Sequence, residues 1–221
     1  WFAMMEDMIA RKTLMTTPIR LARRLVSFPR RKGTPRLALP AFAVDAAAIS
    51  CLSGPAAFRQ TLLTLIAQAT RRIVIVTLYL QDDDGGREVL DALYAAKARR
   101  PELQVSVFVD WHRAQRGLIG KQKSEGNAGM YREYAERLGP GVEIYGVPVQ
   151  NRELFGVLHL KGFVIDDAVL YSGASLNDVY LARHQRYRLD RYHLLRHAPL
   201  ADSMAAFVQR HLRDSEAVRR L

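Results

Sequence analysis

One segment carries most of the functional information in this chain: Val157-Leu158-His159-Leu160-Lys161-Gly162-Phe163-Val164-Ile165-Asp166. Apolar residues alternate with His159 and Lys161, so an extended strand would point both polar side chains to one face and the leucines to the other. A neutral imidazole can attack phosphorus, and a neighbouring ammonium can hold the phosphoryl oxygens. The alternative is a strand edge that carries two basic residues without a catalytic role.

The residues that follow make the functional interpretation more specific. Four residues separate Lys161 from Asp166, and the small-residue turn Ser172-Gly173-Ala174-Ser175 leads to Asn177. This H-x-K-x4-D pattern with its turn resembles the signature of the phospholipase D superfamily. Further stretches resemble the bacterial CDP-diacylglycerol–serine O-phosphatidyltransferases (phosphatidylserine synthases) of that superfamily, and the resemblance covers roughly residues 54–215. These stretches are Leu78–Gly86, Val109–Gly117, Tyr145–Pro148 and Tyr171–Leu181.

The resemblance implies roles for the signature residues. His159, Lys161 and Asp166 would form the catalytic set, with His159 attacking the substrate phosphorus to give a phosphohistidine intermediate and Lys161 binding the non-bridging oxygens. Asn177, together with Ser175, would donate further hydrogen bonds to those oxygens. In the superfamily turn, Gly-Ser-x-Asn, the asparagine comes three residues after the glycine, whereas here Asn177 comes four residues after Gly173. The chemistry implied needs no cofactor.

The position of Asp166 argues for a structural role within that set. It lies seven residues after His159, about 23 Å along an extended chain at ~3.3 Å per residue, so it cannot touch the imidazole unless the chain doubles back. We therefore interpret Asp166 as a carboxylate that ties down a turn. Asp190, on a later predicted strand, is the better candidate to orient the imidazole from its far nitrogen.

One signature supplies only one catalytic histidine. Enzymes of the resembled family carry two signatures in one chain, so this chain looks like one half, the N-terminal half, of such an enzyme. A second histidine must protonate the leaving CMP and deprotonate the incoming hydroxyl. It would come from a second copy of the chain in a homodimer, from a missing second half, or from no source at all. His112 and His193 are the alternatives within the chain, and whether the half is active alone stays open.

A polar segment, residues 110–129, follows the predicted strand 103–110. Loops at the carboxyl ends of strands build the sites of α/β sheets. Arg113 and Arg116 are therefore predicted to contact the phosphates or head group of the substrate, because guanidinium groups form charge-assisted hydrogen bonds with them. The alternative is a flexible, solvated loop.

The order of predicted elements indicates an α/β fold. Apolar residues at helical spacing over 54–69 are followed by a β-branched strand (72–80), a second amphipathic helix (87–100) and the strand 103–110. This order predicts a mixed, mostly parallel sheet flanked by helices on both faces. A short helix (131–138), a strand (142–147), a hairpin strand (168–172), a strand (187–195) and a closing helix (199–212) complete the prediction.

The chain divides by charge into an arm and a globular part. Residues 1–44 hold nine Arg or Lys residues against Glu6 and Asp7, and we predict a basic arm and linker that is partly disordered or lies on a membrane surface. Residues 45–221 form the predicted catalytic half-domain. The net charge of +11 favours polyanionic partners: an anionic membrane, a phosphorylated substrate or nucleic acid.

The sequence also lacks several features. A single cysteine, Cys51, rules out an internal disulfide and fits a reducing compartment. Neither a long apolar run nor a signal-peptide pattern is evident, so we expect a cytoplasmic protein that is peripheral at the inner face of the membrane.

No histidine, cysteine or carboxylate spacing predicts a metal site, and Asp82-Asp83-Asp84 is interpreted as a solvated loop.

Three functions remain open at this point. The first is phosphatidyl transfer from CDP-diacylglycerol to L-serine, which the family resemblance implies. The second is a phosphodiesterase or nuclease that is active as a homodimer, although an interleaved aromatic and basic platform for nucleic acid is absent from the sequence. The third is a non-catalytic module that binds anions or membranes.

Overall fold

The computed structural model describes residues 40–116, 126–149 and 157–221. Residues 42–221 form one compact unit, while nearly all of the predicted basic arm lies outside the described residues. None of the helices in these ranges combines the length and apolar character needed to cross a bilayer.

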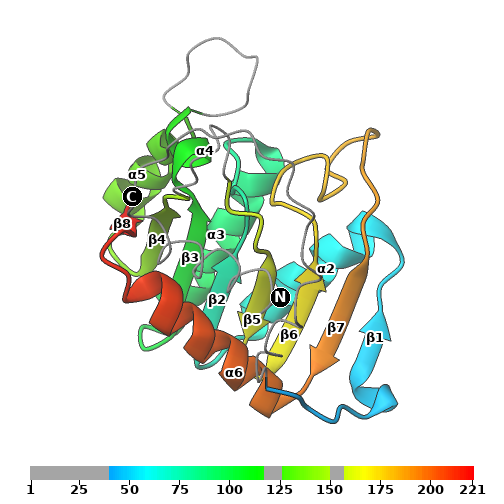
Figure 1. Cartoon of the computed structure of the whole chain (residues 1–221). Coiled ribbons are helices and arrows are strands. Elements are labelled where there is room, and N and C mark those ends of the chain that lie inside the picture. The colour runs from blue at the N-terminus through cyan, green and yellow to red at the C-terminus, as the bar shows by residue number, and fades with distance from the viewer. Residues whose placement is uncertain (1–39, 117–125, 150–156) are drawn as a thin grey trace, which may run out of the picture. The chain divides into compact units, whose positions relative to one another are not determined.

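Helices and strands alternate in the first part of the described chain, and several strands then follow one another without an intervening helix (Figure 1). The strands are β1 (Ile49–Cys51), β2 (Arg72–Val76), β3 (Gln104–Asp110), β4 (Val142–Val147), β5 (Gly162–Ile165), β6 (Ala168–Ser172), β7 (Tyr192–Arg196) and β8 (Arg219–Arg220). The α-helices are α2 (Gly54–Gln68), α3 (Asp84–Arg99), α4 (Trp111–Arg116), α5 (Asn127–Leu138) and α6 (Ala198–Val208). A short 3-10 helix (Ala46–Ala48) precedes β1, and a π-helical turn (Gln209–Arg213) extends α6.

The strands form one mixed sheet in the order β1-β7-β6-β5-β2-β3-β4-β8. Only β2 with β3 and β3 with β4 pair in parallel. The other five pairings are antiparallel. The predicted α/β class and mixed sheet are therefore confirmed, but "mostly parallel" is wrong. The reason is that β5, β6 and β7 follow one another through short or irregular connections, without the crossover helices that parallel pairing requires.

Helices cover both faces of the sheet, as predicted (Figure 1). On one face, side chains such as Ile73, Val107 and Phe163 pack with α2, α3 and α5 in the main apolar core. Residues that alternate with them, including Phe108 and Val164, are buried on the other face, along which α6 runs. This alternation is the period expected of strands that are covered on both sides.

Capping interactions set the start of α3. The carboxylate of Asp83 accepts a hydrogen bond from the Gly86 amide at 2.9 Å, and Asp82 pairs with Arg87. The predicted solvated loop at Asp82–Asp84 is therefore partly helix N-terminus, because Asp83 at the N-cap satisfies an amide that has no partner inside the helix. Gly86 also lies close to the chain, since a Cβ there would stand 1.8 Å from the Gln81 carbonyl oxygen.

Several predicted bounds need correction. The predicted loop 110–129 contains α4 and the first turn of α5, whereas residues 117–125 lie outside the described ranges. The predicted strand around His159 begins only at Gly162. The reason is the register with β2, in which Val76, the last residue of that strand, pairs with Gly162. Residues 157–161 thus have no strand partner there, although Leu158 and Leu160 are buried and His159 is exposed, as the alternation predicted.

Candidate active site

An open cavity of about 490 Å³ lies where β2 and β3 end, β5 begins and β6 ends. Tyr79 reaches it from the segment after β2, Arg113 from α4, and Ser175 from the turn after β6. His159 and Lys161 reach the same cavity from the segment before β5. The full lining consists of Leu78, Tyr79, Arg113, His159, Lys161, Gly173, Ser175, Tyr180 and Arg188.

A larger cavity, of about 930 Å³, lies near the amino ends of β3 and β4. Its described lining includes Lys97, Glu143 and Arg213, but it contains neither a histidine nor a cysteine. Arg213 is already paired there with Glu143 at 2.8 Å. We therefore take the smaller cavity, which holds a nucleophile beside cations, as the candidate active site.

His159 is held by its backbone neighbours. The amide of Leu158 donates a 2.8 Å hydrogen bond to the Asp110 carboxylate, and Lys161 Nζ donates to the carbonyl oxygen of His159 at 3.4 Å. The burial of Leu158 and Leu160 fixes the segment on its inner side. These contacts keep the imidazole at the cavity rim with the ammonium on the same side.

The electrostatics favour a neutral imidazole. Burial lowers the pKa of His159 below its usual 6.5, the positive charges of Lys161 and Arg113 lower it further, and the Asp110 carboxylate opposes them. Burial also lowers the pKa of Lys161, and the negative charge of Asp190 partly restores it. At neutral pH His159 is thus unprotonated and able to act as a nucleophile beside a cluster of cations.

Asp110 is a site residue that the sequence analysis missed. Its side chain is fully buried at the end of β3, where it accepts the amide of Arg113 at 2.9 Å as well as the amide of Leu158. One carboxylate therefore connects α4 to the segment that carries His159. The available signal was a single acidic residue closing an otherwise uncharged strand, Leu103–Asp110.

Two tyrosines and an arginine in the cavity were also missed. Tyr79 forms a side-chain hydrogen bond with Ser175, and burial raises the pKa of its phenol. The guanidinium of Arg188 lies 5.9 Å from the centre of the Tyr180 ring. The predicted Ser175 and Arg113 are brought into the cavity. Arg188 adds a second guanidinium for a phosphate group.

Asn177 does not line the cavity. Its side-chain oxygen accepts the amide of Tyr180 at 3.0 Å, and its side-chain nitrogen lies 3.3 Å from the Gln81 side-chain oxygen. The residue is 7% exposed and stabilises the turn after β6. The prediction that Asn177 donates to the phosphoryl oxygens is therefore not supported by its position, which agrees with the extra residue between it and Gly173.

Asp190 lies beside the lysine and not the histidine. Its carboxylate accepts the amide of Gly173 at 3.1 Å and the amide of Arg191 at 2.6 Å, and its charge acts on Lys161. The carboxylate whose charge acts on His159 is Asp110. The prediction that Asp190 orients the imidazole is corrected accordingly.

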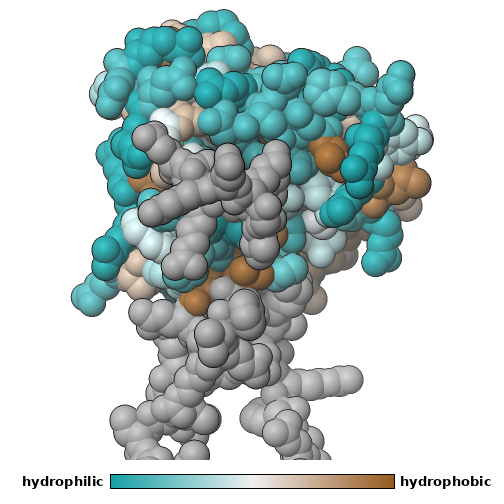
Figure 2. Space-filling view, turned by 90° about the horizontal axis from the view of Figure 1, so that it is seen from above, coloured by the Kyte–Doolittle hydropathy of each residue, from teal (hydrophilic) through white to brown (hydrophobic). Residues whose placement is uncertain are grey.

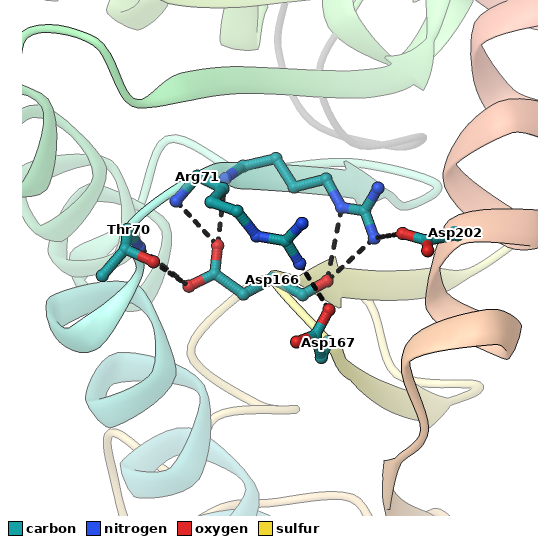
Figure 3. A network of polar contacts seen from close by, with 6 residues as sticks. Thr70, Arg71, Asp166, Asp167 and Asp202 are labelled. Atoms are coloured by element: carbon teal, nitrogen blue, oxygen red, sulfur yellow. Dashed lines mark hydrogen bonds and ion pairs between the residues drawn. The ribbon is translucent and has the colours of Figure 1, made fainter.

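Asp166 follows the last residue of β5, at the end of the strand opposite the cavity. Its carboxylate faces Thr70 and Arg71 (Figure 3). Its carboxylate accepts hydrogen bonds from the amide and hydroxyl of Thr70 and from the amides of Arg71 and Arg72, at 2.8–3.0 Å. The residue has a positive φ of 48°, in the left-handed region that aspartate tolerates better than most residues. The structural interpretation of Asp166 is confirmed, and its membership of the catalytic set is corrected.

The remaining predicted residues stay apart from the cavity or cannot be placed. His112 is exposed on α4 and His193 is half-buried in β7, and neither lines the cavity. Arg116 ends α4, but its side chain lies outside what the structure describes. Among the described residues, His159 is thus the one histidine at the cavity.

The chain is similar to a family of known proteins. Residues 62–181 match the family model described as "Cardiolipin synthase, PLD-like domain". The chain is 52% identical over 200 residues to the CDP-diacylglycerol–serine O-phosphatidyltransferase of Escherichia coli, a match that covers 89% of this chain and 44% of that protein. The chain therefore spans less than half the length of this relative.

Solved structures show the same fold. The phosphatidylserine synthase of Haemophilus influenzae matches with a TM-score of 0.77 and 46% identity, over 82% of this chain and 40% of that one. NucT from Helicobacter pylori matches with a TM-score of 0.55 and 14% identity, over 78% of this chain and 97% of that one, and so shows the fold alone. With a family model that matches more than half of its length, the chain belongs to the phospholipase D-like family.

Proposed function

We propose that this chain supplies one catalytic half of an enzyme that transfers a phosphatidyl group from CDP-diacylglycerol to L-serine and releases CMP. The observation that carries the proposal is the cavity in which His159 stands beside Lys161, Arg113 and Arg188. An imidazole with a lowered pKa and three cations are what a phosphodiester needs for attack at phosphorus. The similarity to two named phosphatidylserine synthases supports the choice of substrates.

The reaction would run in two displacements. The His159 imidazole attacks the phosphorus of CDP-diacylglycerol, a P–N bond forms, and the bond to the CMP oxygen breaks. The hydroxyl of serine then attacks the phosphohistidine, its proton is taken by a base, and the phosphatidyl group leaves the imidazole. Lys161 and the two arginines stabilise the phosphoryl oxygens in both steps.

The acid and base for these steps require a second histidine. His112 and His193 do not line the described cavity, so neither is placed to protonate CMP. We propose that the second histidine comes from another copy of the chain or from a second half, consistent with a chain that covers 44% of its E. coli relative. Residues 1–44 are proposed as a separate basic arm that precedes the half-domain 45–221.

The setting we propose is the cytoplasmic, inner face of a membrane, where the enzyme is peripheral. The net charge of +11 would attract the chain to anionic lipid, and the proposed substrate is itself a lipid. No cofactor takes part in the proposed chemistry.

The test is to incubate the chain with CDP-diacylglycerol, with and without L-serine. The proposal expects serine-dependent release of CMP and an acid-labile phosphoprotein, either with the chain alone or after addition of the part of the E. coli relative that this chain does not match. Cleavage of DNA without release of CMP would replace the proposal with the homodimeric nuclease. A folded protein inactive in every combination would leave a non-catalytic binding module.

The matched variants are His159→Asn and His112→Asn. The first should abolish both turnover and the phosphoprotein, because it removes the nucleophile. The second removes an exposed histidine on α4 and should leave the phosphoprotein in place. A phosphoprotein that persists in His159→Asn would exclude His159 as the nucleophile.

A further inference from the structure

An exposed segment, residues 186–191, borders the candidate active site; we name it the rim segment. It lies between β6 and β7 and has no helix or turn. Leu189 and Tyr187 are 72% and 55% exposed, more than any other large hydrophobic side chain in the described ranges. Arg186, Arg188 and Arg191 surround them.

Backbone contacts hold the rim segment in place. The amide of Arg188 donates to the Val179 carbonyl at 3.0 Å, and the carbonyl of Arg188 accepts the Tyr192 hydroxyl at 3.4 Å. The Arg188 side chain lines the cavity. Tyr187 and Leu189 are both exposed and stand directly before and after Arg188 in the chain. Their exposed apolar surface therefore lies beside a residue of the cavity lining.

The charge around this apolar pair is mostly positive. The rim segment contains three arginines and a single acidic residue, Asp190, whose carboxylate accepts hydrogen bonds from two backbone amides. The surface at the end of the sheet where the candidate active site lies is largely hydrophilic, with a few separate hydrophobic spots (Figure 2). An aromatic and an aliphatic side chain among arginines is the composition of segments that insert at the interface of an anionic bilayer.

We infer that the rim segment docks the chain on an anionic lipid bilayer, with Tyr187 and Leu189 entering the interface while Arg186 and Arg191 contact lipid phosphates. Arg188, which belongs to both the rim segment and the cavity, places the mouth of the site against the membrane. A lipid phosphate could then reach His159 with its acyl chains still in the bilayer. This inference rests on the proposed function for its purpose, but the binding itself is independent of turnover.

The experiment measures co-sedimentation of the 221-residue chain with vesicles made of equal parts phosphatidylcholine and phosphatidylglycerol. Leu189→Ser should lower the partition coefficient about tenfold, because most of a leucine side chain no longer enters the interface. Arg186→Gln with Arg191→Gln should lower it about fivefold per arginine, roughly 25-fold together at low ionic strength, with little change on pure phosphatidylcholine.

Matched controls separate the rim segment from overall charge. Leu138→Ser changes another exposed leucine, 50% exposed at the end of α5. Arg132→Gln with Arg210→Gln removes the same charge from exposed positions on other elements. All variants keep the basic arm, so its contribution is common to every measurement. Circular dichroism checks that each variant is folded.

Equal losses of vesicle binding in the rim variants and in their controls would overturn the inference. So would unchanged vesicle binding combined with loss of binding to a single-stranded oligonucleotide, which would indicate a nucleic-acid contact. Vesicle binding that depends on the rim segment in a protein without phosphatidyl transfer would leave this inference standing and remove the proposed function.

Discussion

Replacing Asp166 with asparagine tests whether the signature's aspartate is structural. Each carboxylate oxygen accepts two hydrogen bonds, Oδ2 from the amide and hydroxyl of Thr70 and Oδ1 from the amides of Arg71 and Arg72. An asparagine presents an NH₂ group to one of these pairs and a neutral oxygen to the other. Asparagine also tolerates a positive φ, so the change adds little backbone strain at φ 48°.

The expected loss follows from the bonds removed. Hydrogen bonds to a charged group contribute about 1.5–3 kcal/mol each, and this site is partly exposed, so losing two of them should lower the free energy of unfolding by about 3 kcal/mol. For a chain of this size the melting temperature should fall by roughly 6–12 °C. The assay is urea denaturation, with thermal melting as a second measurement.

Asp167→Asn is the matched control. This neighbouring carboxylate is 58% exposed and pairs with Arg71 on the surface, so its loss should cost about 0.5 kcal/mol or less. Equal destabilisation by the two substitutions would refute the structural role assigned to Asp166. A large loss of phosphatidyl transfer by folded Asp166→Asn would also refute it, because β5 separates this residue from the cavity.

The pH dependence gives an independent check. Burial alone would raise the pKa of Asp166, but the hydrogen bonds from Arg72, Thr70 and Arg71 lower it below its usual 3.8. A carboxyl group whose pKa is lower in the folded protein stabilises it above the unfolded pKa, and that stability is lost as pH falls through the folded pKa. The difference between wild type and Asp166→Asn should therefore be full near pH 6 and shrink below about pH 4.

Three further predictions concern the site and the start of α3. Asp110→Asn should lower the free energy of unfolding by about 2 kcal/mol, measured in urea, because a buried amide loses its acceptor. It should also move the acidic limb of kcat/KM to lower pH, since the Asp110 charge raises the pKa of His159. Lys161→Met should move that limb to higher pH, because the Lys161 charge lowers the pKa of His159. It should also lower kcat about 10²–10³-fold in the assembly that supports turnover. An unchanged pH profile would contradict the effect of Lys161 on His159. Gly86→Ala should destabilise the chain by about 3 kcal/mol in the same denaturation assay, because the alanine Cβ would overlap the Gln81 carbonyl. A melting temperature equal to wild type would show that the backbone at Gln81 moves to make room.

Local features of this fold follow from the sequence, whereas features that depend on contacts between distant residues do not. The alternation at residues 157–161 predicted the burial of Leu158 and Leu160 and the exposure of His159, because that pattern is local. The start of the strand at Gly162 could not be predicted, since it depends on where β2 stops in the paired register. The exposed edge strands β1 and β8 are three and two residues long, too short for a hydrophobic pattern to predict them.

The same distinction applies to the site. His159, Lys161, Arg113 and Ser175 were predicted, because each follows from a motif or from the end of a strand. The role of Asp110 could not be predicted, because its hydrogen-bond partner Leu158 lies 48 residues away in the chain. Asp190 was assigned to the wrong neighbour for the same reason: strand order decides which basic side chain it faces.

The antiparallel pairing of β5 with β2 has a consequence for how the site is kept in alignment. The chain delivers His159 just before it enters the sheet, whereas Tyr79 and Ser175 come just after it leaves. A slip of β5 by one residue would carry the imidazole about 3.3 Å and turn it to the opposite face. The packing of Phe163 against Phe58, with ring centres 5.7 Å apart in the core, opposes that slip, because the slip would break this contact. An aromatic pair that does not line the cavity thus helps to hold His159 at its rim.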